Sequence, residues 1–410
     1  MIQSSWFPKY AQRGRAPIRA NDPMNHVVAA LGPVAGLLVV LLTVQYLGGC
    51  AGNLGGKTLL KGSGGFNDMQ AKHLIETLSV VAEISPDDPL YQAYYQHYRL
   101  PRDVTHRLSS LRVDGYRIAV QRFQPSRTPV GTVFFVHGYL VHSALHRKLI
   151  AFLLSANMAV ITFDLPGHGL SSGQRGAINE FSDYAKVLDA VVSRFRDAPR
   201  PHLVVAHSTG GACVIQWLRD SNYTVDALVL AAPLVRSKGW WFTQLGTIML
   251  GQSNPVFPRL YRKSTSDLFH LHWVRTRDPL LVREAPFKWV RALVRWESSL
   301  ADYPVLALPV LVLQGDEDQI VNGRHNLSFV RRHFAGVRIT VLEGARHELF
   351  VETDSVLERV FIAIEDFAGI HASEPFRSGT MDEKSQRPSV PTVAGGGMAS
   401  RLHHRPRASP

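Results

Sequence analysis

A serine at the end of an apolar run is the residue best placed in this sequence for nucleophilic chemistry. Residues 204–211 read Val-Val-Ala-His-Ser-Thr-Gly-Gly, which predicts a strand, a sharp turn at Ser208 and the start of a helix. Small residues flank Ser208, as in the pattern G-x-S-x-G, where a strained turn brings strand and helix backbones close together. Ala206 takes the place of the first glycine and lacks glycine's freedom at positive φ. Taken alone, the stretch also fits a plain helix start capped by Ser208 or Thr209.

A serine hydroxyl is a weak nucleophile in water, so a base and an acid are needed beside it. One acidic turn contains Asp316 and Asp318, and residues 344–348, Gly-Ala-Arg-His-Glu, contain His347. Both stretches follow predicted strands, and open α/β sheets place their ligand sites at strand ends. Ser208, Asp318 and His347 occur in the order of an α/β-hydrolase triad, in which the histidine takes the serine proton and the aspartate orients the histidine. Asp316 lies in the same turn and is the alternative acid.

A third stretch supplies backbone donors for a tetrahedral intermediate. His137, Gly138 and Tyr139 follow a predicted strand directly. We expect the backbone N–H groups of Tyr139 and Thr209 to form the oxyanion hole, and each such donor typically contributes on the order of 3 kcal/mol to transition-state stabilisation. We expect the imidazole of His137 to brace this loop by hydrogen bonds.

The rest of the pattern predicts an α/β fold with a mostly parallel sheet covered by helices on both faces. Asp114-Gly115 between two alternating segments predicts a β-hairpin. Short β-rich runs then alternate with helical patterns as far as residue 369. This alternation of strand and helix patterns stops between about residues 234 and 306, where aromatic residues and helical stretches predict an inserted helical cap. The expected strands after the hairpin are 132–136, 159–163, 202–206, 227–231, 310–313 and 338–342.

Charge and cysteine content exclude several classes of protein. The net charge is +12, but no block of Lys and Arg and no nucleic-acid motif accompany it, so we expect no nucleic-acid partner. Cys50 and Cys213 are the only cysteines, which excludes a disulfide framework and an all-cysteine zinc site. We expect neither a metal nor a cofactor.

The N-terminal segment predicts attachment to a membrane. Residues 27–47 are apolar and long enough to span a bilayer, and they follow a basic leader. The run ends in Leu-Gly-Gly-Cys-Ala, which resembles a bacterial lipobox and makes Cys50 the candidate for lipid attachment; an uncleaved signal anchor is the alternative. We therefore expect a bacterial cell-envelope protein. The predicted organisation is 1–50 signal or anchor, 51–86 flexible tether and lead-in, 87–371 catalytic domain, and 372–410 disordered basic tail.

Several motifs together resemble the α/β-hydrolase family of monoacylglycerol lipases, bacterial lysophospholipases and serine aminopeptidase-like hydrolases. The resemblance covers roughly residues 104–369. It implies that the catalytic acid is Asp318 rather than Asp316, and that Asp164 to Gly169 shape a loop beside the site. The motifs are Phe-Phe-Val-His-Gly at 134–138, Phe-Asp-Leu-Pro-Gly-His-Gly-Leu-Ser at 163–171, Ala-His-Ser-Thr-Gly at 206–210, Gln-Gly-Asp-Glu-Asp at 314–318 and Gly-Ala-Arg-His-Glu at 344–348.

The leading hypothesis is a membrane-tethered serine hydrolase that cleaves carboxylic esters of monoacyl lipids through an acyl-enzyme. A serine aminopeptidase or amidase is the alternative enzyme, and it needs an acidic group near the site to hold a substrate ammonium. Asp267, Asp278 and Glu284 in the predicted cap are candidates for that group. A catalytically silent, lipid-binding envelope protein is the alternative from another class.

Overall fold

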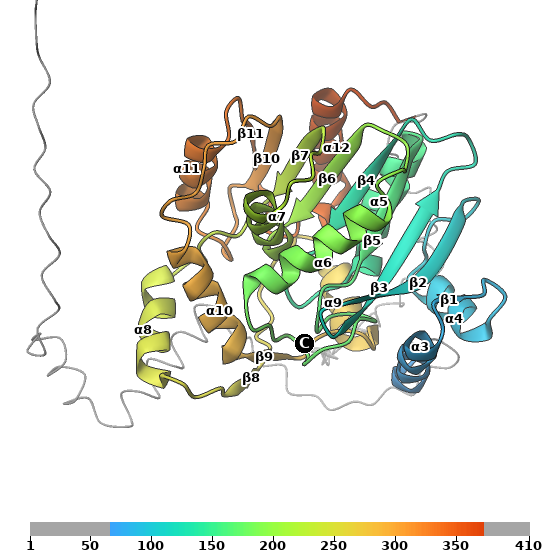
Figure 1. Cartoon of the computed structure of the whole chain (residues 1–410), viewed down its shortest axis with the longest axis horizontal. Helices are drawn as coiled ribbons and strands as arrows, with labels where there is room; N and C mark the ends of the chain where they lie inside the picture. Colours follow the sequence, from blue (N-terminus) through green and yellow to red (C-terminus); the bar gives the residue numbers. More distant parts are fainter. Residues whose placement is uncertain (1–65, 373–410) are drawn as a thin grey trace, which may run out of the picture. The chain divides into compact units, whose positions relative to one another are not determined.

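A nine-stranded, mostly parallel sheet forms the centre of the computed structural model, which describes residues 66–372 (Figure 1). The strand order is β1-β2-β3-β5-β4-β6-β7-β10-β11, with antiparallel pairing from β1 to β5 and parallel pairing from β5 to β11. This confirms the predicted α/β class. The strands are β1 (Glu83–Ile84), β2 (Thr105–Val113), β3 (Tyr116–Gln124), β4 (Gly131–Val136), β5 (Met158–Phe163), β6 (His202–His207), β7 (Ala227–Ala231), β10 (Val310–Gly315) and β11 (Arg338–Leu342).

The hairpin between β2 and β3 forms at the predicted turn. Asp114 and Gly115 have φ values of 46° and 80°. Two consecutive residues with positive φ are what a two-residue type I′ turn requires, and this turn matches the twist of the flanking strands.

Helices cover both faces of the sheet because its central strands are apolar on both sides. Along β4, Val133 and Phe135 belong to one hydrophobic core, whereas Phe134 and Val136 belong to the other. This alternation is the period of a strand, whose successive side chains point to opposite faces. The first core includes residues of α3 (Asp68–Val80), α4 (Pro89–His97), α5 (Arg147–Ser155) and α12 (Asp354–Ala368), and the second includes residues of α6 (Phe181–Arg194), α7 (Thr209–Asp220) and α11 (Gly323–His333).

A long insertion lies between β7 and β10, in the interval where the sequence predicts a cap. In Figure 1, α8 and α10 lie side by side below the ends of the central strands. The helical stretches predicted for this interval are present, whereas the sequence does not predict the short antiparallel pair formed by β8 and β9. The cap segment contains α8 (Trp240–Leu250), β8 (Val256–Pro258), α9 (Leu268–Arg277), β9 (Glu284–Pro286) and α10 (Phe287–Ser298).

The folded unit reaches further towards the N-terminus than the predicted boundary at residue 87. Asn67 caps α3 through a capping box with Gln70, and Leu74 and Leu78 of this helix are fully buried. Strand β1 then pairs with β2. Residues 66–86, which the sequence assigns to the tether and lead-in, are therefore packed structure, because the apolar face of α3 contributes to the first core.

The predicted membrane segment, residues 27–47, and the candidate lipidation site Cys50 lie outside the described residues, as does the tail from residue 373. Within residues 66–372, no helix combines the length and the apolar character that crossing a bilayer requires.

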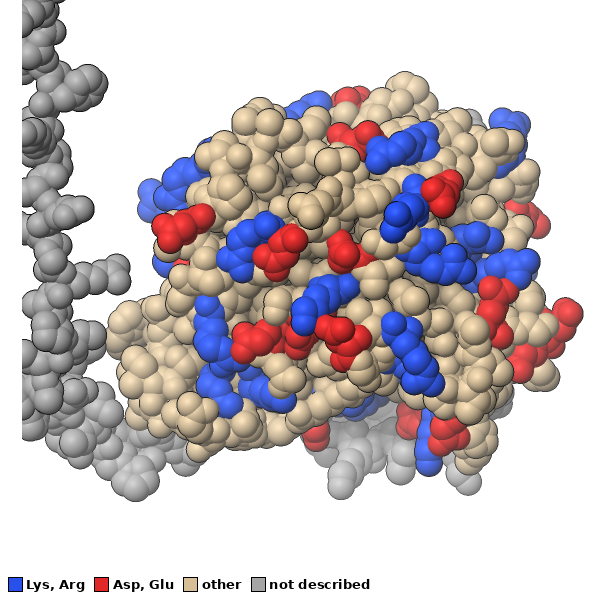
Figure 2. All heavy atoms as spheres, viewed as in Figure 1, with Lys and Arg blue, Asp and Glu red and all other residues tan. Residues whose placement is uncertain are grey.

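Basic and acidic side chains are interspersed over the face shown in Figure 2. Exposed ion pairs of the described residues include Lys186 with Asp114 at 2.9 Å and Arg295 with Glu180 at 3.0 Å. Exposed pairs of this kind contribute little to stability, because solvent and salt screen them. They serve mainly to keep the surface polar.

Candidate active site

Ser208 lies in the sharp turn between β6 and α7, in a strained backbone conformation. Its φ and ψ are 51° and −114°, a region that residues with a side chain rarely adopt. Such a conformation costs on the order of 1–3 kcal/mol and persists only where the surroundings impose it. The backbone N–H of Ser208 donates to Ala231 at 3.0 Å, and its carbonyl accepts from Leu234 at 3.0 Å. Both sides of the turn are thus anchored to the end of β7 and the residues that follow it.

Small residues beside Ser208 allow the close approach that the turn needs. A Cβ at Gly210 would lie 2.3 Å from the carbonyl oxygen of Val136, which is closer than any real side chain can come. Ala206 lies within β6, paired with Val136 and Leu230, so it has extended backbone and does not need positive φ. Alanine in place of the usual glycine is therefore compatible with the turn, since the positive φ falls on Ser208 itself.

The structure brings the three predicted triad residues together. His347 Nε2 lies 2.9 Å from Ser208 Oγ, and His347 Nδ1 lies 2.8 Å from Asp318 Oδ2. All three side chains are buried. Asp316, the alternative acid, is exposed and accepts the backbone N–H of Gly344 at 2.8 Å instead.

The electrostatics of the pair favour a charged Asp318 and a basic His347. Burial raises the pKa of Asp318, but the His347 ring and backbone N–H donors outweigh it and bring the pKa down to about 2. Those donors are the N–H groups of Ile320 at 2.7 Å and Val321 at 3.1 Å. Burial lowers the pKa of His347, but the Asp318 carboxylate outweighs it and leaves that pKa above its ordinary value. His347 is thus suited to accept a proton from Ser208.

The loop that carries His347 is held by contacts that the sequence did not reveal. The fully buried carboxylate of Glu352 accepts the backbone N–H of Arg346 at 3.0 Å and that of Ser266, from the cap segment, at 2.9 Å. The carbonyl of His347 lies 2.9 Å from Nε2 of His207, whose pKa is lowered by burial. Nothing in the sequence distinguishes Glu352 from a solvated surface acid.

Tyr139 and Thr209, the two expected oxyanion donors, lie beside Ser208. Thr209 is the first residue of α7, so its N–H is among those at a helix N-terminus that have no partner within the helix. Tyr139 follows β4 after Gly138, where a Cβ would lie only 3.3 Å from Ser208 Cβ. Tyr139, Ser208 and Thr209 line one pocket. The Tyr139 ring is fixed by stacking on Trp289, with ring centroids 3.8 Å apart.

His137 and Asp164 brace the adjoining loops. His137 Nε2 accepts the backbone N–H of Leu165 at 2.9 Å, while its Nδ1 faces the carbonyl of Gly138 at 2.7 Å. Burial lowers the pKa of His137 to about 4, so the ring is neutral. Asp164 accepts the N–H groups of Ser143 at 2.9 Å and Leu170 at 2.8 Å. These bonds agree with the structural roles that the sequence and the resemblance predict for the two residues.

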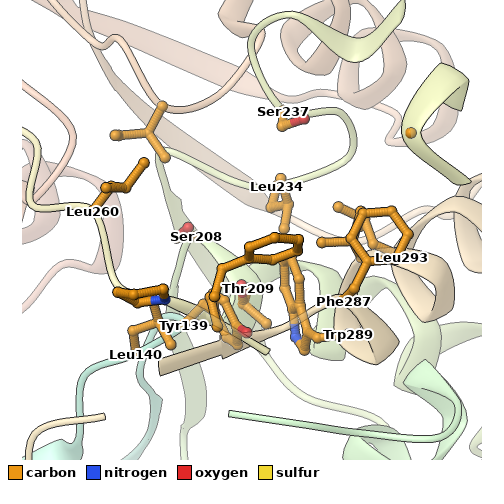
Figure 3. Close-up of a pocket in the computed structure, with 16 residues that line it drawn as sticks. Tyr139, Leu140, Ser208, Thr209, Leu234, Ser237, Leu260, Phe287, Trp289 and Leu293 are labelled. Carbon is orange, nitrogen blue, oxygen red and sulfur yellow. The ribbon is translucent and has the colours of Figure 1, made fainter. Parts of the chain in front are cut away.

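An apolar pocket opens at Ser208 between the strand ends and the cap segment (Figure 3). Carbon dominates the lining in Figure 3, and the few oxygen atoms include the hydroxyls of Ser208, Thr209 and Ser237. No Asp, Glu, Lys or Arg is among the described residues that line it. Its apolar wall includes Leu234, Leu260, Phe287, Trp289 and Leu293.

The three acids that the sequence suggested as partners for a substrate ammonium lie away from the lining of the pocket. Asp278 is buried. Its Oδ1 accepts a hydrogen bond from the Tyr98 hydroxyl at 2.7 Å, and its Oδ2 lies 3.1 Å from His142 Nε2. Asp267 caps α9 by accepting the N–H of His270, and Glu284 is exposed in β9. None of the three acids lines the pocket.

Comparison with known proteins gives consistent similarities. The family profile described as "Serine aminopeptidase, S33" matches residues 127–354. The chain is 27% identical to "Phospholipase YtpA" of Bacillus subtilis over 58% of this chain and 95% of that protein. It is 26% identical to human "Monoglyceride lipase" over 63% of this chain and 88% of that protein. The crystal structure of a soluble variant of Saccharomyces cerevisiae monoglyceride lipase has the same fold, with a TM-score of 0.58, 18% identity, and coverage of 65% of this chain and 95% of that one.

The link between His347 and Asp318 is testable by NMR titration of the histidine ring signals in chelator-treated buffer. We expect Asp318→Asn to lower the pKa of His347, because the adjacent Asp318 carboxylate raises it in the wild type. Glu348 also raises this pKa and Arg262 lowers it, and both remain in the variant. Asp316→Asn is the matched control and should leave the pKa unchanged. Equal shifts in the two variants would contradict the assignment of Asp318 as the partner of His347.

Proposed function

The chain belongs to the serine aminopeptidase S33 family of α/β-hydrolases, and from this premise we propose that it is a serine hydrolase that cleaves carboxylic esters of monoacyl lipids. Ser208 is the proposed nucleophile, His347 the general base and acid, and Asp318 the residue that orients His347. The substrate class is that of a monoacylglycerol lipase or lysophospholipase. The phospholipase and monoglyceride lipase relatives support this class.

One observation carries the proposal. Ser208 Oγ, hydrogen-bonded to His347, lies in the lining of a pocket without charged side chains. Such a pocket suits an aliphatic chain, because each buried CH₂ contributes about 0.8 kcal/mol to binding. It offers nothing to hold an ammonium group, which an aminopeptidase substrate carries. This contrast favours the lipid ester over the aminopeptidase alternative.

The proposed reaction proceeds through an acyl-enzyme. Ser208 Oγ attacks the ester carbonyl carbon while its proton passes to His347 Nε2, and the N–H groups of Tyr139 and Thr209 donate to the oxyanion. The carbon–oxygen bond to the glycerol-bearing alcohol then breaks, and His347 returns the proton to that oxygen. Water adds to the acyl-enzyme with His347 again as base. The products are a fatty acid and free Ser208.

Asp318 contributes by staying ionised throughout. Its low pKa keeps a negative charge beside the ring while His347 carries the extra proton. The hydrogen bond from Nδ1 to Asp318 also fixes the ring so that Nε2 points at Ser208. Both effects stabilise the transition state relative to the resting enzyme.

Attachment to a membrane remains a proposal from the sequence. The apolar run at residues 27–47, followed by Cys50, supports either a lipoprotein or a signal anchor of a bacterial cell envelope. A tether of either kind would keep the domain beside lipid substrates.

A graded series of acyl esters, with monoacylglycerol and lysophosphatidylcholine, tests the substrate class. We expect kcat/KM to rise roughly fourfold per added CH₂ until the pocket is filled, from about 0.8 kcal/mol per CH₂. Ser208→Ala is the control and should lose roughly a thousandfold or more in kcat. Activity confined to short, water-soluble esters would contradict the lipid assignment. Preferred cleavage of aminoacyl amides would instead support the aminopeptidase.

The length of the pocket is testable at Gly246, a buried residue of α8 that lines it. Glycine inside a helix costs about 1 kcal/mol relative to alanine, so Gly246→Leu should not weaken the helix itself. We expect the variant to lose about tenfold in kcat/KM on long-chain esters, equivalent to about two excluded CH₂ groups, and to retain its rate on butyrate esters.

Gln244→Leu is the matched control for this change, since Gln244 is exposed on the same helix. It should leave the chain-length profile unchanged. If Gly246→Leu leaves the profile unchanged as well, the acyl chain does not occupy this pocket.

A further inference from the structure

Three side chains that the proposed hydrolysis does not use lie close to one another beside the triad. His146 ends the short 3-10 helix η1 (Ser143–His146), His207 is the last residue of β6, and Glu348 follows His347. One nitrogen of each ring and one oxygen of the carboxylate lie within 4.8 Å of one another. Both histidines are 1% exposed, and the Glu348 side chain is 14% exposed. Segments far apart in the sequence thus bring three potential metal ligands together.

The hydrogen bond of His207 leaves one nitrogen free to bind a ligand. Nε2 lies 2.9 Å from the carbonyl oxygen of His347, so the ring donates its proton there. A neutral ring that donates from Nε2 carries a lone pair on Nδ1. This Nδ1 is buried and has no hydrogen-bond partner within residues 66–372. A Cβ at Gly138 would lie 2.8 Å from it, so the glycine at this position leaves Nδ1 uncovered.

His146 repeats the same arrangement. Its Nδ1 lies 3.3 Å from the carbonyl oxygen of His142, one turn earlier, which directs the proton to Nδ1 and the lone pair to Nε2. Metal-binding histidines generally donate their other ring N–H to a carbonyl or carboxylate in this way, which fixes the tautomer and the ring. In both rings, the hydrogen bond therefore leaves the other nitrogen with a lone pair for a metal ion.

Glu348 supplies the third donor. Its Oε2 lies 3.8 Å from His207 Nδ1, too far for a hydrogen bond. Donor atoms around a tetrahedral zinc ion at about 2.0–2.2 Å lie roughly 3.4 Å apart. The three donor atoms here lie within 4.8 Å of one another, so side-chain rotations of about an ångström would bring them to that spacing. Glu348 is the most exposed of the three and leads from the cluster towards the surface.

We propose that His146 Nε2, His207 Nδ1 and the Glu348 carboxylate bind Zn²⁺ or a divalent transition ion of similar chemistry. Two imidazole nitrogens and one carboxylate are a ligand set that zinc accepts. Mg²⁺ and Ca²⁺ prefer oxygen ligands and do not suit it. The sequence alone gave no sign of this site, because its ligands are separated by 61 and 141 positions and follow no metal-binding spacing.

A bound ion would connect the segments that carry the proposed nucleophile and base. His207 precedes Ser208, and Glu348 follows His347. The three ligands converge only in the folded chain, so binding stabilises the folded state. The ion would thus hold the segment that carries Ser208 and the segment that carries His347 together.

Equilibrium dialysis of Zn²⁺ against the full-length chain, prepared without a polyhistidine tag, tests this site. We expect wild type to bind one more Zn²⁺ per chain than His146→Phe, and Zn²⁺ to raise the melting temperature of wild type alone by roughly 5 °C. Mg²⁺ should give no shift. Glu348→Gln should weaken binding by about tenfold or more, because it removes the charged ligand and retains the shape.

His325→Gln is the matched control, since His325 is a partly buried histidine on α11 away from the cluster, and it should bind as wild type does. The tail histidines His403 and His404 are present in every variant, so their contribution cancels. Circular dichroism verifies that the variants fold; if His146→Phe does not, Glu348→Gln decides. Equal Zn²⁺ stoichiometry and affinity in wild type and the folded ligand variants would overturn the proposal. The readout is binding, so it is independent of the proposed hydrolysis.

Discussion

The site depends on the backbone of Ser208, which is held at a φ of 51° between β6 and α7. This conformation turns the chain sharply enough to present Oγ to His347 and to begin a helix at Thr209, which lines the same pocket as Ser208. It is imposed from both sides by hydrogen bonds to Ala231 and from Leu234. It also needs Gly210, because any side chain there would meet the Val136 carbonyl. Relaxing the turn would break the hydrogen bond between Ser208 and His347 and move Thr209 as well.

The absence of charged side chains from the described lining of the pocket is the second constraint. It limits which substrates can bind, whereas the triad determines which bonds can be cleaved. A triad of this geometry hydrolyses esters and amides alike, so the triad does not choose between lipid and peptide. The walls from α10 and from the residues after β7 offer apolar contact, and the acids of the cap segment are engaged elsewhere. Desolvating an ammonium group in such a pocket without a partner is costly, whereas an acyl chain is favoured there.

The sheet and the triad were predictable from the sequence because their signals are local. Asp114-Gly115 specifies its turn, and apolar runs that end in polar motifs specify both the strands and the edge where Ser208, Asp318 and His347 meet. Features that depend on how distant segments pack together could not be predicted from the sequence. The sequence could not show that positive φ falls on Ser208 rather than on residue 206, because that depends on how β6 pairs with its neighbours.

Long-range contacts account for the other differences. The short pair β8–β9 has few residues and no turn motif of its own, so its pairing comes from the cap as a whole. The helix α3 follows a glycine-rich stretch typical of a linker, and its place in the fold depends on burial of Leu74 and Leu78. The buried roles of Glu352 and His207 likewise appear only when distant segments meet.

The central claim is that Ser208 is the nucleophile of a hydrolase for monoacyl lipids. Its most direct test is reaction of the folded protein with a long-chain alkyl fluorophosphonate, followed by peptide mass spectrometry. The account predicts one covalent adduct, on Ser208, that forms more slowly when a long-chain monoacylglycerol competes for the pocket. Failure of the folded protein to be labelled, or an adduct on a different residue, would contradict it.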